Sequence, residues 1–189
     1  MTALDWRWKI GEAVERLRTR YRFIGRKTGA PFLGLVYPTE AEATVLKEWH
    51  TQTAALRPEI DVRSVNVLDV TQTVLSALGA EAIVDALADP MPGSNPQSEL
   101  GLLWVNGIVD AIRACLADPG RGKPVVSLER LAAVYPAAGP RDVMQSLWGN
   151  ASDVFDGPIV ILIPGILQGP RTYAFLGHED EFMYRGDLL

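Results

Sequence analysis

Short apolar runs separate helical stretches along this chain, and this alternation is the feature that most limits its fold. Two of the runs are APFLGLVYP (30–38) and GPIVILIPG (157–165). A strand that is apolar at almost every position must be buried on both faces, as happens in parallel sheets covered by helices. Alternating strands and helices favour the same arrangement. We therefore expect an α/β fold with a mostly parallel sheet flanked by helices, in a single domain spanning 1–189.

The remaining elements follow from hydrophobic periodicity and from breaker residues. Further strands are predicted at 60–69, 125–136 and 171–177, so that Val-Tyr-Pro ends a strand both at 36–38 and at 134–136. Helices are predicted at 4–21, through Val45 to Leu56, from Asp69 to Leu87 with a break at Gly79, through Leu102 to Ile112, and at 142–147. An internal loop covers 90–97, and a last short segment covers 183–189.

The first strand runs straight into a helix, which is where a nucleotide phosphate sits in many α/β proteins. A phosphate loop needs glycines and a lysine, and neither occurs between Tyr37 and Val45. Thr39 and Glu42 have the spacing of a capping box. Glu40 and Glu42 also put negative charge where a phosphate would lie. The sequence therefore predicts a P-loop-type layout without Walker motifs and with no bound nucleotide or other cofactor.

Charge is distributed unevenly. The net charge is −5, yet the first thirty residues carry +5, which leaves −10 on the remainder. Six cations fall in a helical N-terminal segment (1–30) with no carboxylate among them: Arg16, Arg18, Arg20, Arg22, Arg26 and Lys27. Such a block is typical of a docking surface, for nucleic acid or for an acidic protein. Pairing with the chain's own acidic remainder is the third possibility.

Other candidate chemistry is sparse. Glu129 and Arg130 interrupt an apolar strand, and we interpret them as a partner contact or a sheet-edge pair rather than as a catalytic carboxylate with its clamp. Cys115 is the only cysteine and lies in an apolar helix, which favours an inert core thiol. His178 belongs to the acidic run GHEDE, which we predict to be a solvated turn.

Several classes of protein are disfavoured by composition. One cysteine and two histidines argue against a structural zinc site, and no metal is expected. The longest apolar run, IVILIPGIL, is too short to cross a bilayer, and from Asp5 and the Trp-Arg-Trp-Lys stretch we expect no signal peptide. We expect a cytoplasmic protein that does not enter the membrane.

The C-terminal third resembles a known family. The stretches LAAVYPAAGPRDVMQSLWG, GPIVILIPGILQGPRTYAFLG and EDEFMYRGDLL are similar in order and spacing to the C-terminal half of the BrxB family. These are small proteins of BREX, the bacteriophage-exclusion systems of bacteria. The similarity rests on Val134-Tyr135-Pro136, Pro164-Gly165, Phe175-Leu176-Gly177 and Tyr184-Arg185, and the first half agrees in layout.

The resemblance implies a non-enzymatic component of an antiphage complex, whose partner is the phosphatase-like PglZ protein of the same system. It transfers no catalytic residue. Our leading hypothesis is an adaptor or assembly subunit. The alternatives are a nucleic-acid-binding module that uses the basic N-terminal helix, and a degenerate nucleotide-binding enzyme. The candidate partner-binding residues are Arg16, Arg18, Arg20, Arg22, Arg26, Lys27, Glu129, Arg130, Tyr184 and Arg185.

Overall fold

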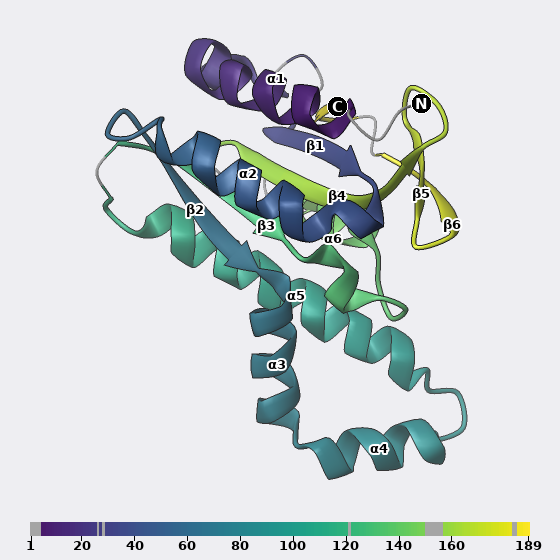
Figure 1. Cartoon of the computed structure of the whole chain (residues 1–189). Helices are drawn as coiled ribbons and strands as arrows, with labels where there is room; N and C mark the ends of the chain where they lie inside the picture. Colours follow the sequence, from purple (N-terminus) through teal and green to yellow (C-terminus); the bar gives the residue numbers. More distant parts are fainter. Residues whose placement is uncertain (1–4, 26, 28, 121, 150–156, 183–184) are drawn as a thin grey trace.

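The computed structural model describes residues 5–25, 27, 29–120, 122–149, 157–182 and 185–189 (Figure 1). Six α-helices lie within these residues: α1 (Asp5–Arg20), α2 (Glu42–Ala54), α3 (Val67–Leu78), α4 (Ala80–Ala88), α5 (Pro96–Ala117) and α6 (Pro140–Gly149). The strands there are β1 (Phe32–Tyr37), β2 (Ile60–Asn66), β3 (Lys123–Glu129), β4 (Ile159–Leu167), β5 (Thr172–Phe175), β6 (His178–Glu181) and β7 (Asp187–Leu188). Three short 3-10 helices are η1 (Tyr21–Phe23), η2 (Thr39–Ala41) and η3 (Leu131–Val134).

The sheet is mostly parallel, in the order β2-β3-β4-β1-β7, which confirms the predicted α/β class. Each neighbouring pair along this order runs parallel. Beyond Pro164, β4 leaves β1 and pairs with β5 in an antiparallel ladder, which β6 extends. β6 corrects the prediction of a solvated turn over GHEDE, because Leu176 and Gly177 at positive φ fold the chain back into a hairpin.

Alternate residues of the central strand face two separate cores. Val160 and Leu162 pack with α1 and α2, whereas Ile159, Ile161 and Ile163 pack with α3, α5 and α6. All five are completely buried, so both faces of β4 are covered by helices. Burying such side chains stabilises the fold by about 1.5–3 kcal/mol each, which explains why an apolar run predicts a buried parallel strand.

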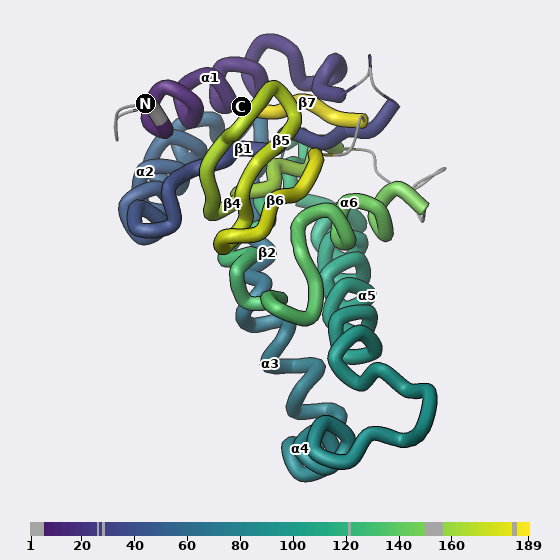
Figure 2. The backbone as a smooth tube through the Cα atoms, turned by 90° about the vertical axis from the view of Figure 1, so that its right-hand side faces the viewer, coloured from purple at the N-terminus to yellow at the C-terminus, as the bar shows by residue number. Residues whose placement is uncertain are grey.

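Three helices extend away from the sheet (Figures 1 and 2). α3 begins at the end of β2 and extends away from the sheet. α4 lies across the far end of α3, and α5 returns along α3 to the body of the domain. Gly79, at φ 85°, allows the predicted break, and α3 and α4 meet there at 85°. We call α3, α4, the connection 89–95 and the first half of α5 the helical arm. α4 packs against α3 and α5, and none of its residues is buried.

Two predicted strands end earlier than expected. The strand predicted at 125–136 ends at Glu129, because Arg130 adopts the left-handed conformation (φ 57°) and η3 follows. Val134-Tyr135-Pro136 therefore lies at the end of a 3-10 helix, not of a strand. The strand predicted at 60–69 ends at Asn66, whose side-chain oxygen accepts a hydrogen bond from the Leu68 N–H at 3.1 Å. Asn66, rather than Asp69, caps α3.

α5 is apolar and long enough to cross a membrane by length and composition, as α3 and α4 would be if counted together. From the sequence, only the shorter apolar run in β4 was considered as a possible membrane span. One face of α5, including Val105, Ile108 and Ile112, packs on the sheet, and 28% of its most apolar stretch is buried. Cys115 lies near its end, partly buried, and burial raises the pKa of this thiol.

Two glycines in helix interiors give a matched test of packing. A Cβ on Gly101 of α5 would lie 2.2 Å from the Ala137 carbonyl oxygen, whereas one on Gly11 of α1 would meet nothing within 4 Å. We expect Gly101→Ala to destabilise the protein by about 1–3 kcal/mol through overpacking. Gly11→Ala should stabilise it by about 0.5–1 kcal/mol through helix propensity. Urea unfolding measures both, and equal effects would contradict the close approach at Gly101.

Two buried tyrosines should make the fold sensitive to alkali. Burial, aided by Glu42, raises the pKa of Tyr37, and burial with Asp180 raises that of Tyr173. An ordinary tyrosine ionises near about pH 10, so the unfolded chain loses these protons first. The stabilisation is present in full below about pH 10 and is lost as pH rises further. Tyrosinate absorbance and circular dichroism should show both residues ionising only on unfolding; ionisation of all five tyrosines in the native fold would contradict this.

Candidate functional site

Glu129 is the last residue of β3 and points into the layer beneath α2. Val125 is four positions before Glu129 in the same strand and belongs to the core with α1 and α2, whereas Val126 belongs to the opposite core. Because side chains alternate along a strand, Ser127 and Glu129 face α2 as well. Glu129 is only 5% exposed. A buried carboxylate has to be paired or hydrogen-bonded.

Four side chains from three elements satisfy this carboxylate directly or indirectly. Ser127 Oγ donates to Glu129 Oε1 at 2.9 Å, and Ser64 Oγ of β2 donates to the same oxygen. His50 Nε2 of α2 lies 3.0 Å from both carboxylate oxygens. Trp49 Nε1 donates to Ser127 Oγ at 2.8 Å and fixes that hydroxyl. We call these five residues the polar cluster, and they join α2 to β2 and β3.

The polar cluster contains a serine, a histidine and a carboxylate, but not in a catalytic arrangement. A hydrolytic triad uses both ring nitrogens, one to take the serine proton and the other to donate to the carboxylate. Here Glu129 and Ser64 both approach His50 Nε2, the serine at 3.5 Å. The Ser64 hydroxyl donates to Glu129 instead. The geometry therefore supports a buried structural carboxylate rather than an activated nucleophile.

A groove of about 560 Å³ opens beside the cluster, between α2 and β2. Its two guanidinium groups are already paired. Arg63 Nε donates to Asp61 Oδ2 at 2.8 Å, and Arg57 Nη2 lies 3.3 Å from Asp61 Oδ1. Arg63 also donates to the carbonyl oxygens of Asp118 and Cys115, and its hydrogen bond to Asp61 raises its pKa. These contacts leave the groove poorly suited to bind an anion.

The junction between β1 and α2 differs in detail from the prediction. No side chain caps α2, whose N-cap is Ala41, so the capping box of Thr39 and Glu42 does not form. The short helix η2 occupies this turn instead, and the Tyr37 hydroxyl donates to Glu42 Oε1 at 3.0 Å. Glu40 and Glu42 still lie in the first turns of η2 and α2. Their charge opposes a phosphate there, as the sequence indicates.

The basic N-terminal segment is partly neutralised by the protein itself. Arg16 Nε donates to Glu12 at 2.7 Å, and its Nη1 lies 3.9 Å from Asp187 of β7. Arg18 Nη1 lies 3.7 Å from Glu15, a more exposed pair. The internal-charge explanation therefore holds for Arg16, whose side chain is only 26% exposed.

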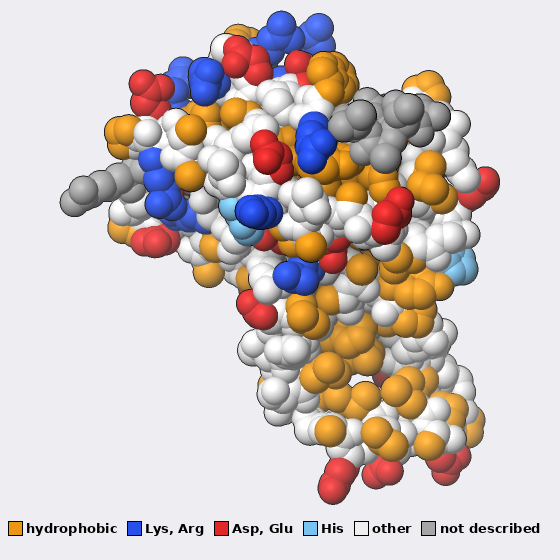
Figure 3. All heavy atoms as spheres, in the orientation of Figure 1, with side chains coloured by type: hydrophobic (Ala, Val, Ile, Leu, Met, Phe, Trp, Pro, Cys, Tyr) orange, Lys and Arg blue, Asp and Glu red, His pale blue; other side chains and the backbone are white. Residues whose placement is uncertain are grey.

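Other cations of this segment are available to a partner. Arg20, Arg22 and Lys27 are exposed, and blue side chains gather over the α1 end of the molecule in Figure 3. Arg26 lies outside the described residues. The Tyr21 hydroxyl donates to the Pro124 carbonyl at 2.6 Å, which places the end of α1 at the amino-terminal edge of β3.

The remaining predicted partner-binding residues are dispersed. Glu129 and Arg130 lie at the carboxyl end of β3, away from the basic segment, and they diverge: Glu129 is buried and Arg130 exposed. The Arg185 guanidinium stacks 3.6 Å above the Trp148 ring centroid. Tyr184 lies outside the described residues. The structure therefore does not gather these residues into one site.

The helical arm is the feature that the sequence prediction missed. Of the eleven large hydrophobic side chains that are exposed among the described residues, seven belong to it: Leu68, Leu78, Val84, Leu87, Met91, Leu102 and Leu103. Figure 3 shows hydrophobic side chains gathered over the projecting part of the molecule. Apolar helices are usually core helices, so their hydrophobicity alone could not reveal this exposure. The signal was charge: no Lys, Arg or His occurs between Arg63 and Arg113.

Among groups of His, Cys, Asp and Glu in the described residues, none has three members placed to hold a metal. His178 contacts the Tyr135 hydroxyl at 2.6 Å, and Asp180 pairs with Arg141 at 3.5 Å. Comparison with protein-family models, with curated proteins and with solved structures finds no match.

The polar cluster predicts a difference between two alanine substitutions. Glu129→Ala leaves two hydroxyls without their acceptor and should lower the free energy of unfolding by about 1–3 kcal/mol. His50→Ala removes a partner whose side chain is 55% exposed, and should cost less than about 1 kcal/mol. Urea denaturation compares the two variants. Loss of a biochemical activity in a normally stable His50→Ala protein would contradict the structural role.

Proposed function

We propose that this chain is a non-enzymatic adaptor or assembly subunit of a bacterial BREX antiphage complex in the cytoplasm. The observation that carries the assembly role is the helical arm, whose exposed apolar side chains project from an otherwise well-packed domain. Contiguous apolar surface on a protein in water marks an interaction site. The resemblance of the C-terminal third to the BrxB family supports placing that interaction in BREX.

The charge distribution favours an adaptor over a single-surface binder. Exposed arginines gather at the α1 end, and the arm carries only acidic charged residues. Figure 1 places α1 and α4 at opposite ends of the molecule. Two surfaces of different chemistry suit a subunit that contacts two partners at once. The phosphatase-like PglZ protein of the same system is the partner that the family resemblance implies.

Binding is also favoured over catalysis by the state of the polar side chains. The one buried carboxylate of the described residues, Glu129, accepts hydrogen bonds from both serines. The groove arginines pair with Asp61. Neither set leaves a nucleophile with an adjacent base, which covalent catalysis needs.

Co-purification tests the adaptor role. The full chain, co-expressed with a PglZ-like protein of a BREX system, should co-elute with that protein on size exclusion as a defined complex. A chain that elutes alone would contradict the proposal. A gel shift with duplex DNA at low salt addresses the nucleic-acid alternative, which predicts binding with a steep salt dependence.

A charge-reversal variant tests whether the basic segment contributes. Arg20→Glu with Arg22→Glu changes exposed side chains and leaves the internally paired Arg16 intact. We expect the thermal midpoint to stay nearly unchanged, because exposed charges contribute little to stability. The complex should weaken and become less sensitive to salt. Unaltered assembly would exclude this segment from the interface while leaving the adaptor role in place.

A further inference from the structure

α4 lies at the far end of the helical arm and belongs to neither hydrophobic core. Val84 and Leu87, one turn apart on this helix, are 62% and 50% exposed. Residues three apart lie on the same face of a helix, so the two side chains form one apolar ridge. Met91, in the connection that follows, is 76% exposed and extends the apolar surface.

A stripe of carboxylates runs beside this ridge, from the first turn of α4 to Asp89, the residue that follows the helix. Glu81, Asp85 and Asp89 follow each other at intervals of four residues. Like charges at this spacing destabilise a helix. Asp85 and Asp89 also lie at the C-terminal end, where the helix dipole repels negative charge. The arm therefore holds an electrostatic conflict in isolation that nearby positive charge would relieve.

No charge of the arm itself provides that relief. From Ser64 to Ile112 the chain has no Lys, Arg or His, but six carboxylates: Asp69, Glu81, Asp85, Asp89 and Glu99 in the arm, and Asp110 in the second half of α5, which pairs with Arg113 at 3.3 Å. Among the described residues all six are exposed. Red side chains mark the tip of the arm in Figure 3.

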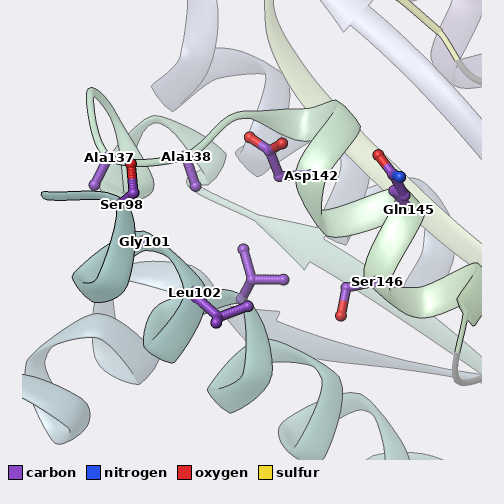
Figure 4. A pocket seen from close by; sticks show the side chains of 9 residues that line it. Ser98, Gly101, Leu102, Ala137, Ala138, Asp142, Gln145 and Ser146 are labelled. Carbon is purple, nitrogen blue, oxygen red and sulfur yellow. The ribbon is translucent and has the colours of Figure 1, made fainter. Parts of the chain in front are cut away.

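A hollow lies where α5 meets the body of the domain. The hollow measures about 460 Å³ and lies between α5 and the stretch 137–146 (Figure 4). Leu102, 60% exposed, and the buried Val105 form its apolar floor on the α5 side. Ala137 and Ala138 line the opposite side, and Asp142 adds another carboxylate to its edge. A hollow of this composition fits an apolar side chain flanked by basic residues.

We infer that the helical arm docks onto an apolar groove with a rim of Lys and Arg on a partner protein, with α4 inserted as the leading helix. This inference rests on the proposed function and specifies which surface performs it. Helix-in-groove recognition uses apolar anchors about one turn apart, as Val84 and Leu87 are. The basic rim neutralises the carboxylate stripe, which explains why a repulsive arrangement exists on an exposed helix.

Charge disfavours the other occupants. Two copies joined arm to arm by two-fold symmetry would bring two acid-only surfaces together. A bilayer surface with anionic lipids repels the carboxylates, and interfacial helices characteristically carry Lys and Arg on the polar face. Nucleic acid is repelled for the same reason.

Calorimetric titration of the full-length chain with the purified PglZ-like protein tests the docking. Val84→Gln with Leu87→Gln should weaken binding by about tenfold or more. The thermal midpoint of this double variant should equal that of the wild type, because α4 contains no buried residue. The matched control is Ile166→Gln, a residue that is 64% exposed on β4 outside the arm, which should bind like the wild type.

A second variant tests the charge. Asp85→Asn with Asp89→Asn removes repulsion, so the free chain should be equally or more stable, yet it should bind at least about threefold more weakly and with a flatter salt dependence. A merely destabilised arm would instead show lower stability together with weaker binding, and that result would overturn the inference.

Each other outcome is decisive. Unchanged affinity in both arm variants, with wild-type binding intact, overturns the docking surface and leaves the adaptor role. Absence of wild-type binding overturns both. Sedimentation velocity in which the wild type self-associates and the Val84/Leu87 variant does not would make the arm a self-interface, contrary to the inference. Arm-dependent flotation with phosphatidylserine vesicles would likewise overturn it.

Discussion

β4 lies between β3 and β1, and because its side chains from Ile159 to Ile163 are all buried, each face of the sheet requires its own layer of helices. α1 and α2 form one layer, and α3, α5 and α6 contribute to the other. The two layers differ in how far their helices extend beyond the sheet. α2 ends close to the sheet, whereas α3 and α5 continue beyond it and leave α4 without a core of its own.

The polar cluster shows how a charge is accommodated in such a layered domain. Glu129 lies where β3 emerges from beneath α2, and three donors on two strands and a helix surround its carboxylate. In water the carboxylate would be solvated at no cost to packing. Here it fixes the position of α2 relative to β2 and β3, so its burial is tied to the register of the sheet. The carboxyl end of β3 is thereby occupied by structural hydrogen bonds.

Features that depend on neighbouring residues could be predicted from the sequence. The apolar run of β4 requires burial wherever it lies, and Gly79 permits a sharp bend whatever surrounds it. The partners of Glu129 could not be predicted, because His50 and Ser64 are 79 and 65 residues away in the sequence and only the fold brings them together. The pattern of residues predicted Arg130 as a companion of Glu129, but Arg130 has a left-handed backbone that ends the strand, and it is exposed while Glu129 is buried. The exposure of α4 could not be predicted for a different reason: an apolar helix on the surface has the same amino-acid composition as an apolar helix in a core.

The separation of charge between α1 and the arm has a kinetic consequence. With basic side chains at one end and only carboxylates along the other, the molecule carries a dipole moment along its length. In the electric field of a charged partner such a dipole experiences a torque, which rotates the molecule before any surfaces touch. Encounters then begin in a narrow range of orientations, and the association rate rises without any added contact in the final complex. Since the Debye length is about 8 Å at physiological ionic strength, this alignment acts over the last few ångströms of approach.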